Sequence, residues 1–153
     1  MTNPIAFPSK TTHLSLPLLF VGQAQKEPFI NQAFSLIDGL VTGIVNDSMA
    51  TPPADPQEGA SFRILEGATG DWAGHDNAIV LRIGGAWEFV TPYNGMTSFD
   101  QAAGVRLYFY DAWQKAAEPT LPSGGATIDV EARSAVSELV DALRAAGVFE
   151  KPA

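Results

Sequence analysis

Acidic residues and histidines are the side chains of this sequence best suited to acid–base or metal chemistry, but their spacing favours neither. His75 lies between Asp71 and Asp76 in a glycine-rich stretch, and the other histidine, His13, is far away in the sequence. Three such residues within one short loop match no established metal-ligand spacing. We therefore expect no metal site and no cofactor.

Motifs of covalent catalysis are missing as well. The sequence contains no cysteine, which excludes a thiol nucleophile, a thiolate metal site and a disulfide bond. It has no G-x-S-x-G motif, and Gly67–Gly70 lacks the lysine of a phosphate-binding loop. None of the 17 acidic residues stands out as half of a glycosidase pair. The sequence predicts no catalytic residues and a protein that is not an enzyme.

Aromatic residues form a more informative set. Trp72, Trp87 and Tyr93 lie on or beside strand ends and loops of the expected sheet. Aromatic rings stack on the apolar faces of sugars, and neighbouring Asp, Asn and Gln side chains bind the hydroxyl groups. These three residues are our candidates for glycan contact. The alternative for Trp87 is a place in the core of the sheet, whereas Trp72 is more open to a surface role.

Length, composition and charge restrict the class of protein. A chain of 153 residues suits one domain, and 46% hydrophobic with 17% charged residues is typical of an ordered globular protein. The net charge of −8 argues against a nucleic acid or an anionic membrane as partner, because phosphate contacts need clustered Lys and Arg.

Residues 1–22 predict an extended N-terminal arm, because the segment contains three prolines and no helical periodicity. Its second half is apolar, and side chains such as Leu16, Leu18 and Phe20 need cover from water. Two interpretations remain open. The arm covers the core of its own domain, or it packs on a neighbouring subunit of a symmetric assembly.

Residues 23–153 predict a single α+β domain. Apolar residues three and four apart predict amphipathic helices over 28–45 and 129–146, the second capped by Asp129. Alternating residues and glycine turns over 58–114 predict a small antiparallel β-sheet between them. We expect the two amphipathic helices to flank this sheet.

Four consecutive motifs carry a resemblance to a known family. The sequence reads GQAQKE over Gly22–Glu27, TPPADPQEG over 51–59, GATGDWAG over 67–74 and GGAWEFVTPYNG over 84–95. In this order and spacing, the motifs resemble an uncharacterised domain family of alphaproteobacterial phages, prophages and gene transfer agents. The likeness covers roughly Leu14–Trp113 and thus most of the chain.

Members of that family look like virion surface components: head spikes of gene transfer agents and tail-fibre-associated proteins, in contact with the polysaccharide surface of the host. The resemblance implies a non-enzymatic virion structural protein, located at the virion surface after assembly in the bacterial cytoplasm. Longer members carry further C-terminal fibre or receptor domains, whereas this sequence ends at Ala153. We therefore expect the base or adaptor of a spike or fibre.

The partners implied are other copies of the chain and other virion proteins, such as capsid, spike or fibre subunits. Polar residues just before an amphipathic helix satisfy its free N–H groups and contact a partner together. The candidate anchoring and oligomerisation residues are Leu16, Leu18, Phe20, Gly22, Gln23, Gln25, Lys26, Glu27 and Asn31. The alternative function is a carbohydrate-binding module that itself contacts host capsular polysaccharide.

Overall fold

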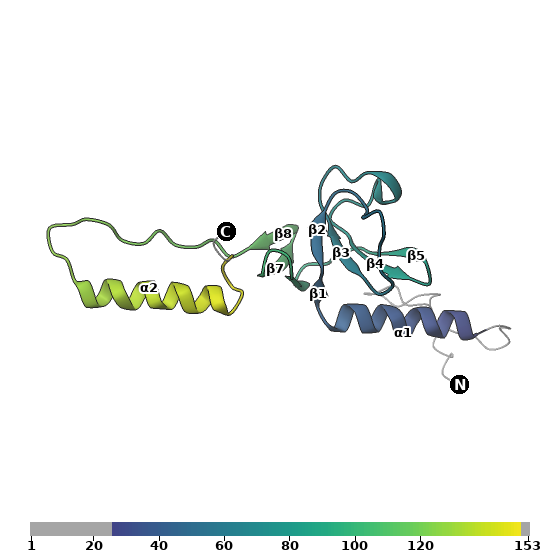
Figure 1. The fold of residues 1–153 in the computed structure, drawn as a ribbon, viewed down its shortest axis with the longest axis horizontal. Coiled ribbons are helices and arrows are strands. Elements are labelled where there is room, and N and C mark those ends of the chain that lie inside the picture. The colour runs from purple at the N-terminus through teal and green to yellow at the C-terminus, as the bar shows by residue number, and fades with distance from the viewer. Residues whose placement is uncertain (1–25, 151–153) are drawn as a thin grey trace, which may run out of the picture.

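The fold is α+β and elongated. A computed structural model describes residues 26–150, apart from the side chain of Glu27, and the predicted arm lies outside the described residues. Within them, two α-helices accompany two four-stranded β-sheets. Figure 1 shows the sheets gathered on one side of the molecule and the second helix extending away from them.

The first sheet has the strand order β2-β3-β4-β5. Its strands are β2 (Asp47–Met49), β3 (Ser61–Ile64), β4 (Ile79–Ile83) and β5 (Ala86–Val90). Strand β2 runs parallel to β3, and the remaining pairs are antiparallel. The turn between β4 and β5 is formed by Gly84 and Gly85, both with positive φ, which confirms the hairpin expected from this glycine pair.

The second sheet has the strand order β1-β6-β7-β8. Its strands are β1 (Ile44–Val45), β6 (Thr97–Asp100), β7 (Val105–Tyr110) and β8 (Ala112–Lys115). Strand β1 runs parallel to β6, and the other pairs are antiparallel. Both sheets therefore contain one parallel pair at an edge.

The prediction of a small antiparallel sheet is confirmed in part: most strand pairs are antiparallel, but the strands form two sheets, each with one parallel pair. Residues 44–45 belong to the helix predicted over 28–45, and residues 46–57 precede the sheet predicted over 58–114. In the structure, residues 44–49 instead supply β1 and β2, the parallel edge strands of different sheets. The chain changes sheets at Asn46, whose N–H donates to Ser61 O at 2.8 Å while its carbonyl accepts from Ala102 N–H at 3.2 Å. Such pairing joins residues far apart in the sequence, and short strands give little periodic signal of their own.

Helix α1 (Glu27–Val41) covers one face of the first sheet. Pro28 occupies its first turn as expected, but the helix ends four residues early, because Gly43 takes a positive φ of 61°. Its buried side contributes Leu36 to a core with residues such as Ile79 and Leu81 of β4. Gly39 faces Leu81 directly, so the helix lies close against the strand.

The opposite face of the first sheet is covered by the loop between β3 and β4, which contains the short 3-10 helix η1 (Gly70–Trp72). Here Trp72 forms a second core with Phe62, Ile64, Ala78 and Val80. Ala78 and Val80 lie on this side and Ile79 and Leu81 on the other, which is the alternation of a strand buried on both faces.

Helix α2 (Val130–Ala145) matches the prediction in its bounds and in its cap, since Asp129 accepts a hydrogen bond from Ala132 N–H at 2.9 Å. It does not flank a sheet. Residues 116–128 run back along the helix (Figure 1), and an ion pair between Glu118 and Arg144 joins the two. At its C-terminal end, Gly147 O accepts from Arg106 N–H of β7 at 2.7 Å.

Replacing Gly39 by alanine tests the contact between α1 and β4. Helix propensity alone favours alanine by up to about 1 kcal/mol. A Cβ at position 39, however, overlaps the Leu81 side chain, so we expect Gly39→Ala to lower the free energy of unfolding by about 1–3 kcal/mol in urea titrations. Asn31→Ala on the exposed side of α1 is the control and should be neutral or stabilising. Stabilisation by Gly39→Ala would contradict the close packing of helix and strand.

Candidate assembly surface and inter-sheet cavity

The predicted anchoring residues lie mostly before the first described element. Six of them are outside the described residues: Leu16, Leu18, Phe20, Gly22, Gln23 and Gln25. Lys26 is half-buried and directly precedes α1, whose backbone begins at Glu27. Asn31 is exposed and lines a groove of about 420 Å³ between α1 and the β4–β5 hairpin. Of the predicted anchoring residues, Asn31 is the one that the described structure places on this groove.

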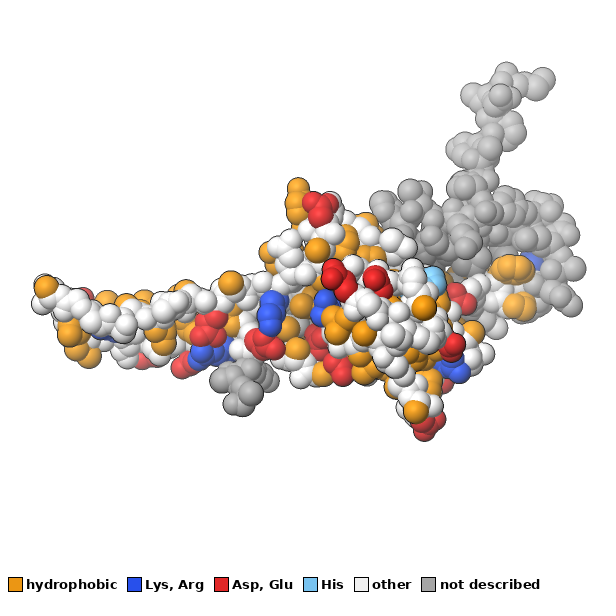
Figure 2. Space-filling view, turned by 90° about the horizontal axis from the view of Figure 1, so that it is seen from above, with side chains coloured by type: hydrophobic (Ala, Val, Ile, Leu, Met, Phe, Trp, Pro, Cys, Tyr) orange, Lys and Arg blue, Asp and Glu red, His pale blue; other side chains and the backbone are white. Residues whose placement is uncertain are grey.

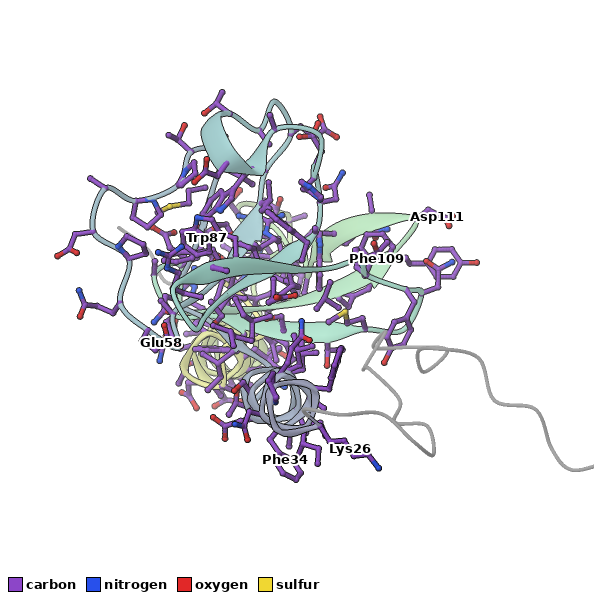
Figure 3. The ribbon with its side chains drawn as sticks, turned by 90° about the vertical axis from the view of Figure 1, so that its right-hand side faces the viewer. Lys26, Phe34, Glu58, Trp87, Phe109 and Asp111 are labelled. Carbon is purple, nitrogen blue, oxygen red and sulfur yellow. The ribbon has the colours of Figure 1, made fainter. Side chains whose placement is uncertain are left out.

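The wall of that groove is fixed by Glu58. Its carboxylate accepts hydrogen bonds from Gly84 N–H at 2.6 Å and Gly85 N–H at 3.2 Å, which holds the segment before β3 against the hairpin turn. Figure 3 shows Glu58 and Lys26 on different sides of α1. Glu58 is thus a structural residue of the groove, and sequence analysis did not single it out.

Helix α1 carries a second apolar face that no described residue covers. Ile30, Phe34, Ile37 and Val41 follow one another at spacings of four, three and four residues. Phe34 is 64% and Val41 77% exposed, and Figure 3 shows Phe34 pointing away from the sheets. We call these four residues the α1 stripe. The residues of α1 that pack on the first core are instead Leu36 and Leu40.

Helix α2 has a similar exposed face. Ala132, Val136, Leu139 and Leu143 are spaced by four, three and four residues, and Leu139 is 59% exposed. We call these residues the α2 stripe. Figure 2 shows hydrophobic side chains along the projecting part of the molecule that α2 forms with residues 116–128.

A different side of α2 contacts residues 116–128. Arg133 donates hydrogen bonds to Pro122 O, at 3.5 Å, and to Gly124 O, and Arg144 pairs with Glu118. Val140 is the only buried side chain within α2. The contacts of α2 with residues 116–128 therefore include several polar ones on this side of the helix, whereas Val136 and Leu139 of the α2 stripe are exposed to solvent.

The predicted glycan contacts are only partly available. Trp72 is 0% exposed, so the surface role expected for it is wrong. Its ring packs against the rings of Phe62 and Trp87, with 5.5 Å and 5.3 Å between the ring centroids. Trp87 is half-buried over this core, and the Arg82 guanidinium lies 5.0 Å from its ring. Tyr93 is exposed and lines a separate hollow beside the end of α1.

The loop with the two candidate acids and His75 has structural roles. His75 stacks on Phe89, with 3.7 Å between ring centroids. Asp76 accepts hydrogen bonds from Gly67 N–H at 3.3 Å and Ala68 N–H at 2.9 Å. In the described part of the chain, no three His, Asp or Glu side chains are arranged to hold a metal ion.

A polar cavity of about 330 Å³ lies between the two sheets. Strands β2 and β3 contribute Asp47, Ser48 and Arg63, and strands β6 and β8 contribute Asp100, Trp113 and Gln114. An ion pair between Lys115 and Glu150 stands at its edge. Sequence analysis missed this site, because its residues come from segments that only the fold brings together.

The cavity has a hydrogen-bonded floor. Arg63 Nε donates to Ser48 Oγ at 2.7 Å, and the Ser48 hydroxyl donates to Asp100 Oδ2 at 2.5 Å. Asp100 is only 3% exposed, and its Oδ1 accepts from Ala103 N–H at 3.0 Å. Burial lowers the pKa of Arg63 from its ordinary value, and the negative charge of Asp100 opposes that shift.

Comparison with known families matches the part of the chain that forms α1 and the two sheets. A family model described as a protein of unknown function, DUF2793, matches residues 30–114, more than half of the chain. The chain belongs to the DUF2793 family. The DUF2793 match runs from the first turns of α1 to β8 and ends before α2. No curated protein matches the chain. None of the described helices is long and apolar enough to cross a membrane.

Removing the Asp100 carboxylate tests the floor of the cavity. We expect Asp100→Ala to lower the free energy of unfolding by about 2–4 kcal/mol, because it leaves the partly buried donors of Ser48 and Ala103 without their acceptor and empties the space of a buried side chain. Asp100→Asn keeps an acceptor for Ala103 N–H and should cost less. The control is Glu66→Ala at an exposed position, expected within about 0.5 kcal/mol of the unmodified protein. An Asp100→Ala variant as stable as this control would refute the network.

Proposed function

We propose that this DUF2793 protein is a non-enzymatic structural component of a phage or gene transfer agent particle. In this proposal it forms the base or adaptor of a spike or fibre and supports attachment to the host surface. Two findings support it: the motif resemblance and the exposed stripes of α1 and α2. The stripes are the observation that carries the proposal, because they are surfaces that a protomer of an assembly needs.

The spacing of both stripes is that of a coiled-coil seam. Apolar residues four and three apart form the a and d positions of a heptad, and such a seam is buried best by another helix with the same spacing. Within one chain the two helices do not supply each other with this cover, because they lie end to end along the same edge of the molecule (Figure 1). The partner that provides matching helices is another copy of this chain.

We propose a cyclic homo-oligomer in which like helices meet around a common axis. A cyclic axis that runs alongside the helices brings equivalent helices together, so α1 packs on α1 and α2 on α2. Neither stripe contains a charged residue, so the stripes themselves bury no like charges. Burial of side chains such as Phe34, Val41 and Leu139 contributes roughly 1.5–3 kcal/mol for each residue fully removed from water. The sheets then face outward.

In this arrangement the groove that Asn31 lines lies beside the seam of α1. The proposed partners of the groove and arm are capsid, spike or fibre subunits. The proposed location is the virion surface, after assembly in the bacterial cytoplasm.

The alternative proposal, a carbohydrate-binding module that contacts host capsule, loses support at its predicted residues. Trp72 is buried, and Trp87 and Tyr93 belong to separate parts of the surface. A sugar needs several contacts converging on one ring. The three predicted residues do not converge in this way.

Single charges placed in the stripes test the assembly. We expect the full chain to be multimeric by light scattering at tens of micromolar, and Leu139→Asp or Val41→Asp to lower the molar mass, because an aspartate in the seam loses its water without gaining a partner. Ser134→Asp, on the opposite side of α2 from the stripe, is the matched control and should keep the mass.

Circular dichroism of each variant checks that the fold is intact. A monomeric full chain would contradict the proposal. A multimer whose mass is unchanged by both stripe variants would contradict it as well.

A further inference from the structure

The cavity between the sheets contains a cation that the fold does not fully satisfy. Arg63 makes one side-chain hydrogen bond within the described residues, through Nε to Ser48. Its two terminal amino groups have no acceptor there, and no carboxylate of the described residues forms an ion pair with it. Both oxygens of the nearby Asp100 already accept other hydrogen bonds.

A guanidinium whose terminal amino groups are open to solvent and lack an acceptor among the described residues fits a carboxylate. The planar fork of Arg matches two carboxylate oxygens, and partial removal from water strengthens the attraction. Arg63 loses part of its hydration, since burial is the main cause of its lowered pKa. A dianionic phosphate suits the site less well. The acids Asp47, Asp100 and Glu150 outnumber Arg63 and Lys115 on the cavity wall, so every negative charge of a ligand is repelled by the wall as a whole, and a single charge held at Arg63 is favoured over two.

The rest of the cavity indicates a molecule with several hydroxyl groups. Its volume of about 330 Å³ accommodates a ring-sized ligand rather than a simple anion. Acceptors and donors surround that volume: Asp47, the Gln114 amide and the Lys115–Glu150 pair. Trp113 adds one aromatic side chain to the wall.

We propose that this cavity binds one carboxylate-bearing sugar unit, of the size of a hexuronic acid, with Arg63 holding the carboxylate. The site is formed within a single chain by both sheets, so binding does not require the helices to assemble. It differs from the predicted glycan contacts, none of which lines the cavity.

Ligand-observed NMR and calorimetry on the full chain test this inference. We expect saturable binding of glucuronate or galacturonate with a dissociation constant of about 1 mM, and at least roughly tenfold weaker binding of glucose and of acetate. Glucose lacks the carboxylate, and acetate lacks the hydroxyl groups. Equal binding of glucose and glucuronate would overturn the role of Arg63. Equal binding of acetate and glucuronate would overturn the sugar site.

Two variants locate the ligand. Arg63→Gln should abolish binding, and Arg63→Lys, which keeps the charge but not the fork, should weaken it roughly tenfold. The matched control is Arg106→Gln, which removes a positive charge from an exposed position of β7 outside the cavity and should leave the affinity unchanged. Folding is checked by thermal denaturation. Absence of saturable binding to the unmodified chain, or unchanged affinity in a folded Arg63→Lys variant, would overturn the inference.

Discussion

The crossover of the chain at Asn46 determines how the rest of the molecule is arranged. Its N–H bonds to the first sheet and its carbonyl to the second, and its side-chain Oδ1 accepts from Ser61 N–H at 2.9 Å. The Asn46 amide also donates to Gln101 at 3.3 Å. Strands β1 and β2, on either side of Asn46, belong to different sheets, so the two sheets stand beside each other and leave the polar cavity between them. The position of α1 follows, because the helix leads directly into β1.

The two parts of the structure then have distinct roles. The sheets bury their own apolar residues, as the cores around Leu81 and Trp72 show. The helices do so only partly: α1 buries the side that carries Leu36, and α2 contributes the single buried side chain Val140. Much of the exposed apolar surface lies on the helices, along one edge of the molecule (Figure 1), and the sheets and their loops expose Tyr93, Tyr108 and Tyr110. This distribution favours an assembly in which the helices meet and the sheets remain outside.

Local signals in the sequence were sufficient for some elements and not for others. The Gly84–Gly85 hairpin and the Asp129 cap were predictable, because each depends on neighbouring residues alone. The parallel strands at residues 44–49 were not, since their pairing partners are distant in the sequence. Trp72 lies in a turn-rich loop that folds back over the sheet, so its burial depends on tertiary packing. The cavity around Arg63 was unpredictable for the same reason, as both sheets contribute to it.

Single-cysteine cross-linking tests most directly whether α2 packs on α2 of another copy. The chain has no cysteine of its own, so a cysteine at Leu139 is the only thiol present. At a symmetric seam two such thiols approach within the roughly 4 Å between Cβ atoms that a disulfide requires. The account predicts disulfide-linked dimers of Leu139→Cys under mild oxidation at low concentration, and none of Ser134→Cys. Equal cross-linking of the two variants, or none by either, would contradict it.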